Sequence, residues 1–171
     1  MTPRQDVPRQ QFREVFGNFC TGVAVITAST GGGPVGFSCQ ALTVVSTDPP
    51  LMLFCPTKTL GCWPPIARSG RFGVHVLAAE QGRLARLFGT PGADKFGSVD
   101  WAPSPSGTPV LAGVLSWAEC EVQAVHDGGD HHIVVGRVVE LGDSRSGEPL
   151  LYHRGRLAAA PFLRPAEMAT I

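Results

Sequence analysis

The sequence predicts a mainly β fold: an antiparallel β-barrel with a few peripheral helices. Short apolar segments of strand length recur along the chain. Most connections between them are short and rich in Gly, Pro and Asp, as in hairpins. No strand–helix–strand alternation runs through the sequence, which argues against a doubly wound parallel sheet. We expect closure into a barrel because closure removes exposed sheet edges.

Length and composition limit the classes of protein that fit. The 171 residues, 43% of them hydrophobic, suit one domain over residues 1–171, with a core at 12–157 and poorly ordered termini. Fourteen basic residues balance fourteen acidic ones, so we expect no non-specific nucleic-acid binding. We expect a cytoplasmic protein without membrane association, because no apolar run could span a bilayer and no signal-peptide core is present.

The first third is expected to hold one helix and three strands. The apolar side chains of the helix recur at helical spacing: Phe12, Val15, Phe16 and Phe19. Thr21-Gly22 ends this helix. The strands are expected where Val, Ile, Leu and Thr gather, at residues 23–28, 35–46 and 51–55.

Two more helices are expected among the remaining strands. One covers residues 63–69, with prolines in its first turn and Gly70 at its end. The other covers residues 80–88. A long irregular connection, residues 89–107, is expected to be functional or mobile. The further strands are expected at residues 72–77, 110–111, 117–126, 132–141 and 150–153, and the tail after Leu157 shows little pattern.

The five cysteines favour neither a disulfide framework nor a zinc site. Their number is odd, and no two are separated by two residues as zinc ligands often are. We expect Cys20 and Cys120 to be small buried hydrophobic residues. Cys39 and Cys55 are candidates for lining a pocket.

Small polar residues interrupt the predicted strand 35–46 at Ser38, Cys39 and Gln40. Small side chains and backbone groups let a flat aromatic ligand approach closely, so this stretch is one candidate binding wall. A strand whose polar face simply meets solvent explains the pattern equally well. Both interpretations stay open at this point.

Residues 55–59 are a candidate anion site, because two hydroxyls and Lys58 come just before the helix that starts at Trp63. Backbone N–H groups and the helix dipole would favour a phosphate there. The alternative is an ordinary helix cap with a solvated lysine. Lys95, on the long connection, either contacts a second phosphate or faces water.

The triplet Gly129-Asp130-His131 lies at the turn of the predicted hairpin. It places an imidazole at the rim of a sheet, where a ligand could reach it, unless His131 is only a solvated turn residue. His131 and His132 point to opposite faces of a strand, so no metal site is expected. The sequence has no P-loop signature, and the glycines spaced like a dinucleotide signature at residues 31–36 lie in an expected hairpin loop between two strands and do not open a helix, so no standard dinucleotide site is expected.

Several short motifs follow one another in a specific order from Phe12 to Gly155. They are Phe12-Arg13, Gly17, Thr21-Gly22-Val23, residues 36–42, Ser46-Thr47-Asp48-Pro49-Pro50-Leu51, Trp63 with Ile66, Gly70-Arg71-Phe72, Asp94-Lys95-Phe96, Gly129-Asp130-His131 and Tyr152-His153-Arg154-Gly155. This order resembles the flavin reductase family, the small reductase components of two-component flavin-dependent monooxygenases. Cys39-Gln40 and residues 54–58 are most similar to reductases that serve aromatic-ring or steroid-degrading hydroxylases.

The resemblance implies a split β-barrel that forms a homodimer and binds FMN, or FAD, in a groove near the dimer interface. It implies an NAD(P)H:flavin oxidoreductase, in which hydride passes from NADH or NADPH to the flavin. The reduced flavin then supplies a partner monooxygenase, in aromatic or steroid hydroxylation. Because the flavin carries the redox chemistry, no strongly shifted acid or base is required.

The resemblance also implies roles for individual residues. Those expected along the isoalloxazine ring are Ser38, Cys39, Gln40, Ala41 and Leu42, with Ser46 close by. Those expected around the ribityl chain and phosphate are Cys55, Pro56, Thr57, Lys58 and Trp63, and those closing one side of the flavin are Lys95 and Phe96. The nicotinamide is expected to contact His131, oriented by Asp130, between Tyr152 and Arg154.

Two other functions remain open on the sequence. A non-catalytic flavin-binding module would keep the groove of residues 38–58 without engaging a nicotinamide. A pyridoxamine-phosphate oxidase-like enzyme would need several arginines aimed at a substrate phosphate, whereas the arginines here fall mostly on predicted helices and the tail.

Overall fold

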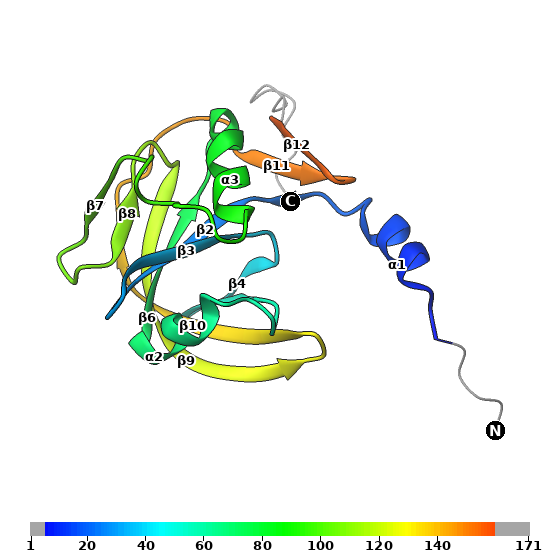
Figure 1. The fold of residues 1–171 in the computed structure, drawn as a ribbon, viewed down its shortest axis with the longest axis horizontal. Coiled ribbons are helices and arrows are strands. Elements are labelled where there is room, and N and C mark those ends of the chain that lie inside the picture. Colours follow the sequence, from blue (N-terminus) through cyan, green and yellow to red (C-terminus); the bar gives the residue numbers. More distant parts are fainter. Residues whose placement is uncertain (1–5, 160–171) are drawn as a thin grey trace.

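One large antiparallel sheet dominates the fold (Figure 1). The computed structural model describes residues 6–159. The sheet has seven strands in the order β3-β2-β6-β9-β10-β5-β4, and every neighbouring pair is antiparallel. Their bounds are β2 (Ala24–Thr30), β3 (Gly33–Cys39), β4 (Leu42–Thr47), β5 (Pro50–Phe54), β6 (Arg71–Val76), β9 (Ser116–Gly128) and β10 (His131–Leu141).

The two edge strands of this sheet, β3 and β4, are consecutive in the chain. Only Gln40 and Ala41 separate them. Three Cα–Cα steps span at most about 11 Å, so the opposite edges of the sheet must come together at this link. The sheet therefore curls into a barrel, but β3 and β4 do not pair with each other, which leaves the barrel split. The expected antiparallel split barrel is confirmed.

Smaller elements surround the barrel (Figure 1). A three-stranded sheet contains β1 (Thr21–Gly22), β11 (Leu150–His153) and β12 (Arg156–Ala159), and a hairpin contains β7 (Trp101–Pro103) and β8 (Pro109–Leu111). The helices are α1 (Arg9–Phe16), α2 (Trp63–Ser69), the 3₁₀ turn η1 (Ala79–Gln81) and α3 (Gly82–Gly89). None of the helices within residues 6–159 combines the length and the apolar character needed to cross a membrane.

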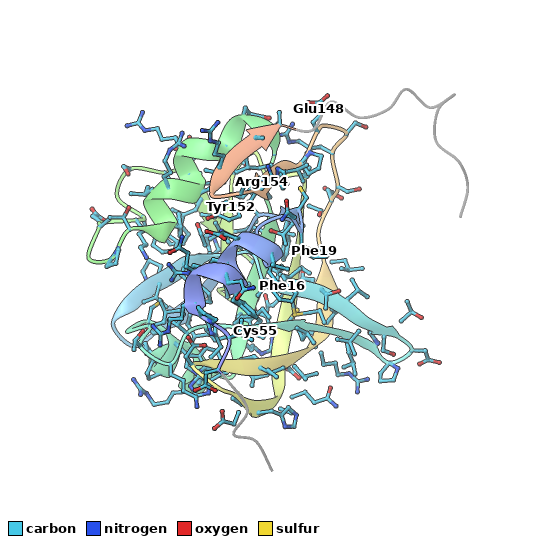
Figure 2. The ribbon with its side chains drawn as sticks, turned by 90° about the vertical axis from the view of Figure 1, so that its right-hand side faces the viewer. Phe16, Phe19, Cys55, Glu148, Tyr152 and Arg154 are labelled. Carbon is cyan, nitrogen blue, oxygen red and sulfur yellow. The ribbon has the colours of Figure 1, made fainter. Side chains whose placement is uncertain are left out.

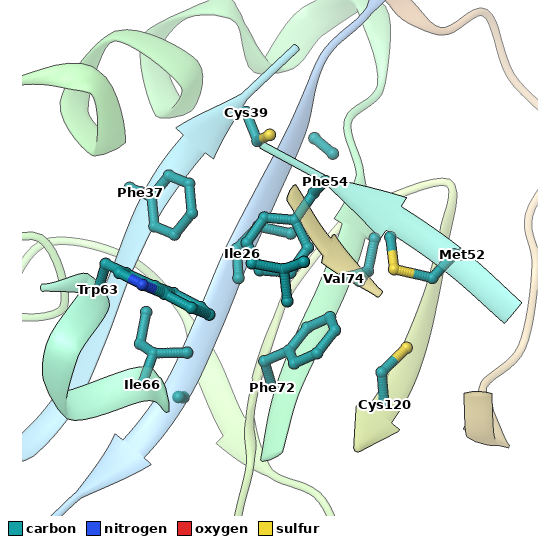
Figure 3. Close-up of a cluster of buried hydrophobic side chains, with 13 residues drawn as sticks. Ile26, Phe37, Cys39, Met52, Phe54, Trp63, Ile66, Phe72, Val74 and Cys120 are labelled. Atoms are coloured by element: carbon teal, nitrogen blue, oxygen red, sulfur yellow. The ribbon is translucent and has the colours of Figure 1, made fainter. Parts of the chain in front are cut away.

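Aromatic side chains fill the barrel interior (Figure 3). Phe54 is fully buried and packs edge-on against Phe72, with ring centroids 4.9 Å apart, and against Trp63 at 5.8 Å. Gly136 makes room for this cluster, because a Cβ there would lie 2.4 Å from Cζ of Phe72. A second core, between the barrel and α3, contains Val25 and Phe88. Strand β2 serves both cores, since alternate side chains of a strand point to opposite faces.

A buried carboxylate fastens the β7–β8 hairpin to the sheet. Glu119 on β9 is completely buried. It accepts hydrogen bonds from Ser104 (2.8 Å) and Ser106 (2.5 Å) and pairs with Arg71 of β6 at 3.1 Å. Burial raises the pKa of Glu119, but the hydrogen bonds from the serines and Arg71 together outweigh burial and lower it. The carboxylate therefore stays ionised and joins the hairpin to two strands.

The structure corrects several sequence predictions. The segment 35–46 is two strands, because the chain crosses the split at Gln40 and Ala41. The connection 89–107 includes strand β7, and the tail after Leu157 continues in β12 as far as Ala159, beyond which it lies outside the described residues. Cys120 is buried as expected, but Cys20 is exposed, so that prediction was wrong.

Helix α1 is shifted and exposed relative to the prediction. It covers Arg9–Phe16 and has no buried residue. Its apolar side chains are largely exposed: Phe12 by 54%, Val15 by 58% and Phe16 by 60%, followed by Phe19 at 74%. The helical spacing was identified correctly, but the core of this chain does not cover the apolar face.

Candidate active site

A hollow of about 750 Å³ opens at the split between β3 and β4. Three segments line it, namely residues 37–41, residues 55–62 and residues 88–95, together with one side chain at the start of β10. The predicted site residues that the structure brings together here are Ser38, Cys39, Gln40, Ala41, Cys55, Pro56, Thr57, Lys95 and His131.

The wall formed by residues 38–41 follows from the break between two strands. The side chains of Gln40 and Ala41 are exposed where the chain leaves the sheet, while their carbonyl oxygens accept from the amides of Leu42 and Cys55, each at 3.0 Å. Ser38 is less free, because its hydroxyl donates to the carbonyl oxygen of Ala85 at 2.6 Å and so joins β3 to α3. The wall therefore offers a ligand the side-chain amide of Gln40, and it holds no bulky side chain.

The opposite wall is a loop docked on the start of β10. The amide of Lys58 donates to the Asp130 carbonyl oxygen at 2.9 Å, and the amide of His132 donates to that of Pro56 at 2.9 Å. Thr57 and Thr59 line the hollow from this loop. The side chain of Lys58 forms an ion pair with Asp127 at 2.9 Å instead of lining the hollow.

His131 is positioned by its neighbour in the sequence. Its Nδ1 lies 2.7 Å from Oδ1 of Asp130, and its backbone bridges to Thr57. This hydrogen bond and the imidazole charge lower the pKa of the exposed Asp130. A proton shared between Nδ1 and the carboxylate leaves Nε2 as the ring nitrogen available to a ligand in the hollow.

Lys95 supplies the positive charge of the hollow. Its ammonium donates to the carbonyl oxygen of Gly36 at 3.0 Å, which leaves other N–H groups for a ligand. The neighbouring Phe96 does not line the hollow. It packs behind it, with its ring 5.3 Å from that of Phe88 and 5.6 Å from that of Trp101.

Three thiols also line the hollow: Cys39, Cys55 and Cys62. Burial raises the pKa of each, to about 11 for Cys39, so all three are neutral near pH 7. Neutral thiols are weak nucleophiles and act here as small apolar lining. His75 lies elsewhere, fully buried in β6, where burial lowers its pKa to about 4.

Other predicted residues lie outside this hollow. Trp63 is buried in the barrel core, and Leu42 and Ser46 belong to β4. Tyr152 and Arg154 line a second hollow, against α1 (Figure 2). Arg154 is fixed there through its amide, which donates to the Gly17 carbonyl oxygen at 3.1 Å.

Several lining residues were missed by sequence reasoning. They are Phe37, Leu60, Gly61, Cys62, Phe88, Gly89, Pro91 and Gly92, whereas Thr59 was part of the predicted anion site. The cluster of glycine and proline at 89–92 was a signal for a loop, and long loops near a site are often functional. Nothing local to Phe37 or Leu60 distinguishes them from core residues.

The lining determines what the hollow can do. Its described residues include no carboxylate, and its ionisable groups are His131, Lys95 and the three neutral thiols. The hollow can hold a flat, partly apolar molecule and balance a negative charge, but it offers no nucleophile–base pair. Fold and site together define a class: a split-barrel protein whose chemistry is carried by a bound planar cofactor.

Comparison with known proteins identifies the family. The model of the flavin reductase like domain matches residues 16–161. A flavin-dependent monooxygenase reductase subunit, HsaB of Rhodococcus jostii, is 50% identical over 147 residues, covering 86% of this chain and 75% of that protein. The crystal structure of nitrilotriacetate monooxygenase component B from Mycobacterium thermoresistibile shares 43% identity at a TM-score of 0.88, over 95% of this chain and 90% of that one.

A third relative was solved with its ligands. The NADH:FAD oxidoreductase SgcE6 of Streptomyces globisporus, in complex with NAD and FAD fragments, is 34% identical with a TM-score of 0.86, over 96% of this chain and all of that one. The chain belongs to the flavin reductase family. It is an NAD(P)H-dependent flavin oxidoreductase that supplies reduced flavin to a monooxygenase. The resemblance inferred from the motif order is confirmed.

Proposed function

We propose that FMN or FAD occupies the main hollow of a homodimer, with its ring along residues 38–42 and near Ser46. Its ribityl chain and phosphate lie along the loop of residues 55–58, and Lys95 closes one side of the flavin, while Trp63 and Phe96 support the site from behind its lining. His131 and Asp130, with Tyr152 and Arg154, serve the nicotinamide of the co-substrate. The observation that carries this arrangement is the joining of residues 38–41, Thr57, Lys95 and His131 in one hollow.

The residues present fit a flavin. The volume of about 750 Å³ lies within the usual range of small-molecule sites. Phe37, Leu60 and Phe88 supply apolar surface for a ring, and Lys95 with the hydroxyls of Thr57 and Thr59 supplies donors for a phosphate. When bound, the flavin accepts the hydride equivalent of NADH or NADPH and carries the redox chemistry.

The chain's own residues orient the reactants. Asp130 holds the His131 ring through the 2.7 Å contact at Nδ1, which presents Nε2 to the co-substrate. Positioning of this kind is the main contribution expected of the protein, because two rings must stack at near-contact distance. The apolar lining of Cys39, Cys55 and Cys62 excludes water from the stacked rings.

The exposed face of α1 supports the homodimer. An eight-residue helix is too short to be stable in water on its own, and this one buries none of its side chains in the chain itself. Contiguous exposed apolar patches mark interaction surfaces. A second copy of the chain that covers Phe12, Val15, Phe16 and Phe19 explains both facts.

The partner that consumes the reduced flavin is a monooxygenase acting on an aromatic or steroid ring, in the cytoplasm. The similarity of Cys39-Gln40 and residues 54–58 to reductases of such hydroxylases supports this choice. A reductase component of 4-nitrophenol monooxygenase from Rhodococcus opacus is 38% identical over 152 residues, which agrees with an aromatic substrate for the oxygenase.

The test is turnover. The protein is mixed with FMN or FAD and with NADH or NADPH, and the loss of the reduced-nicotinamide absorbance is followed. We expect flavin-dependent oxidation of the nucleotide, with none when flavin is omitted. Binding of flavin without oxidation of either nucleotide would reject the enzyme and favour a flavin-binding module.

A further inference from the structure

Lys58 does not line the main hollow, although every other residue from 55 to 62 does. Its ammonium forms an ion pair with Oδ1 of Asp127 at 2.9 Å instead. Its neighbours Thr57 and Thr59 both line the hollow, so the lysine side chain starts at the rim of the hollow. The positive charge nearest to this loop is therefore held by a carboxylate on the adjoining β9–β10 hairpin.

The hairpin turn holds Asp127 in place independently of Lys58. Asp127 lies near the end of β9, and its Oδ1 also accepts from the backbone amide of Gly129 at 2.9 Å. The hydrogen bond from Lys58, the hydrogen bond from the Gly129 amide and the charge of the lysine all lower the pKa of the exposed Asp127. The carboxylate is therefore ionised near pH 7 and stays a ready acceptor for the ammonium.

The backbone on both sides of the ion pair is fixed as well. The amide of Lys58 donates to the Asp130 carbonyl oxygen at 2.9 Å, and the amide of His132 donates to that of Pro56 at 2.9 Å. The ammonium can thus leave Asp127 by rotation about the single bonds of the flexible lysine side chain, while the loop stays docked. The Lys58 side chain is 38% exposed and that of Asp127 is 77% exposed, and ion pairs exposed in this way stabilise little. A phosphate in the hollow, with nearly two negative charges, can therefore compete with Asp127 for the ammonium.

We propose that Asp127 competes with the flavin phosphate for Lys58 and thereby weakens the binding of flavin. This inference rests on the proposed function, which places that phosphate along residues 55–58. A lysine that must first leave a carboxylate stabilises a nearby phosphate less than a free lysine does. A reductase that supplies reduced flavin to another enzyme has to release it, and weaker binding of this kind shortens the time for which the flavin stays bound.

The experiment compares FMN with riboflavin, which lacks the phosphate, on the variant D127N. Asparagine keeps the size of Asp127 and an oxygen for the Gly129 amide, but it removes the charge that holds Lys58. The Kd of each flavin is measured from the change in flavin fluorescence at low salt. We expect D127N to bind FMN at least threefold more tightly than wild type and riboflavin within twofold of wild type, because only FMN carries the phosphate. The gain for FMN should become smaller at high salt, which screens exposed charges.

Two further variants test whether the effect passes through Lys58. E121Q removes a carboxylate from the same strand, β9, where Glu121 pairs with Arg71. It should bind FMN and riboflavin within twofold of wild type. The double variant D127N/K58M lacks the released ammonium and should lose the gain for FMN.

The remaining outcomes overturn the proposal or the function on which it rests. An FMN affinity of D127N that rises less than threefold, or falls, overturns the proposal. An equal gain for riboflavin, the same gain in E121Q, or a gain that persists in D127N/K58M overturns it too, because the effect then does not pass from Lys58 to the phosphate. Wild-type protein that binds flavin but oxidises neither NADH nor NADPH rejects the proposed function, while the comparison of FMN with riboflavin still decides the role of Asp127.

Discussion

Removing the Glu119 carboxylate should loosen the β7–β8 hairpin and destabilise the whole domain. In Glu119→Ala the hydroxyls of Ser104 and Ser106 and the Arg71 guanidinium lose their shared acceptor. Breaking a buried pair by removing one partner costs about 3–5 kcal/mol of the free energy of unfolding, and we expect the lower end, since Arg71 is half-exposed and keeps Glu121. For a chain of this size 3 kcal/mol corresponds to a fall in Tm of about 6–12 °C.

Two variants separate the buried charge from the surface pair. Glu119→Gln keeps the shape and should cost about 1–2 kcal/mol. Glu121→Gln, whose side chain is 45% exposed, should cost less than about 1 kcal/mol although it also contacts Arg71. Chemical denaturation with fluorescence detection measures the free energy of unfolding of Glu119→Ala, Glu119→Gln and Glu121→Gln. A Glu119→Ala variant within about 0.5 kcal/mol of wild type, the usual range for surface changes, would refute the reasoning.

The same carboxylate predicts a pH dependence. Its pKa is lower in the folded state than the ordinary value of 4.5. Its stabilisation is therefore fully present above the unfolded pKa and is lost as pH falls through the lower folded pKa. The difference in the free energy of unfolding between wild type and Glu119→Gln should become smaller below about pH 4.5 and stay constant above it. If this difference in the free energy of unfolding becomes larger on acidification, the pKa of Glu119 is not lowered by folding.

The other predictions concern the site, the dimer and the core. His131→Ala should raise the KM for NADH at least tenfold and leave the Kd for FMN within twofold, with the exposed His126→Ala as control; equal losses for both ligands reject its role. Phe16→Asp should convert the dimer to a monomer, as measured by light scattering at dilute protein concentration. Val125→Asp, which also changes an exposed apolar residue, should stay a dimer. If Phe16→Asp stays a dimer, α1 is not part of the interface. Gly136→Ala should cost about 1–3 kcal/mol of stability, because the new Cβ would lie 2.4 Å from Cζ of Phe72. Gly31→Ala is the control, because a Cβ added at Gly31 would have no atom within 4 Å. If the two substitutions lower the free energy of unfolding equally, steric overlap with Phe72 is not the cause.

Local patterns predicted those parts of the fold that depend on neighbours in sequence. The helix over residues 63–69 was predicted from prolines that fit a first turn, and the structure ends it at Gly70 with φ of 72°. The hairpin around Gly129 was predicted from its turn residues, and Gly129 has φ of 79°. The break between β3 and β4 was missed, because β-rich composition continues across it and only the return of the chain to the far sheet edge ends the strand.

The candidate site was predicted where the motifs carry its polar groups. Ser38, Gln40, Thr57, Lys95 and His131 meet in one hollow although they are far apart in sequence. The motif order placed these residues together, and their spacing alone could not have done so. Trp63 shows the limit: the resemblance implied a contact with the ribityl chain and phosphate, yet the residue is 5% exposed and its ring packs on Phe54. Whether a large aromatic faces a ligand or the interior depends on tertiary packing that the local sequence does not determine.

The gap between β3 and β4 bears on how the flavin can leave. In a fully closed barrel, widening an opening between two neighbouring strands would require breaking backbone hydrogen bonds between them. Strands β3 and β4, which flank the opening of the hollow, form no such hydrogen bonds with each other, and the two residues Gln40 and Ala41 connect them at one end. With the flavin in the proposed site, the opening could widen by bending of β3 or β4 without breaking a hydrogen bond between these two strands.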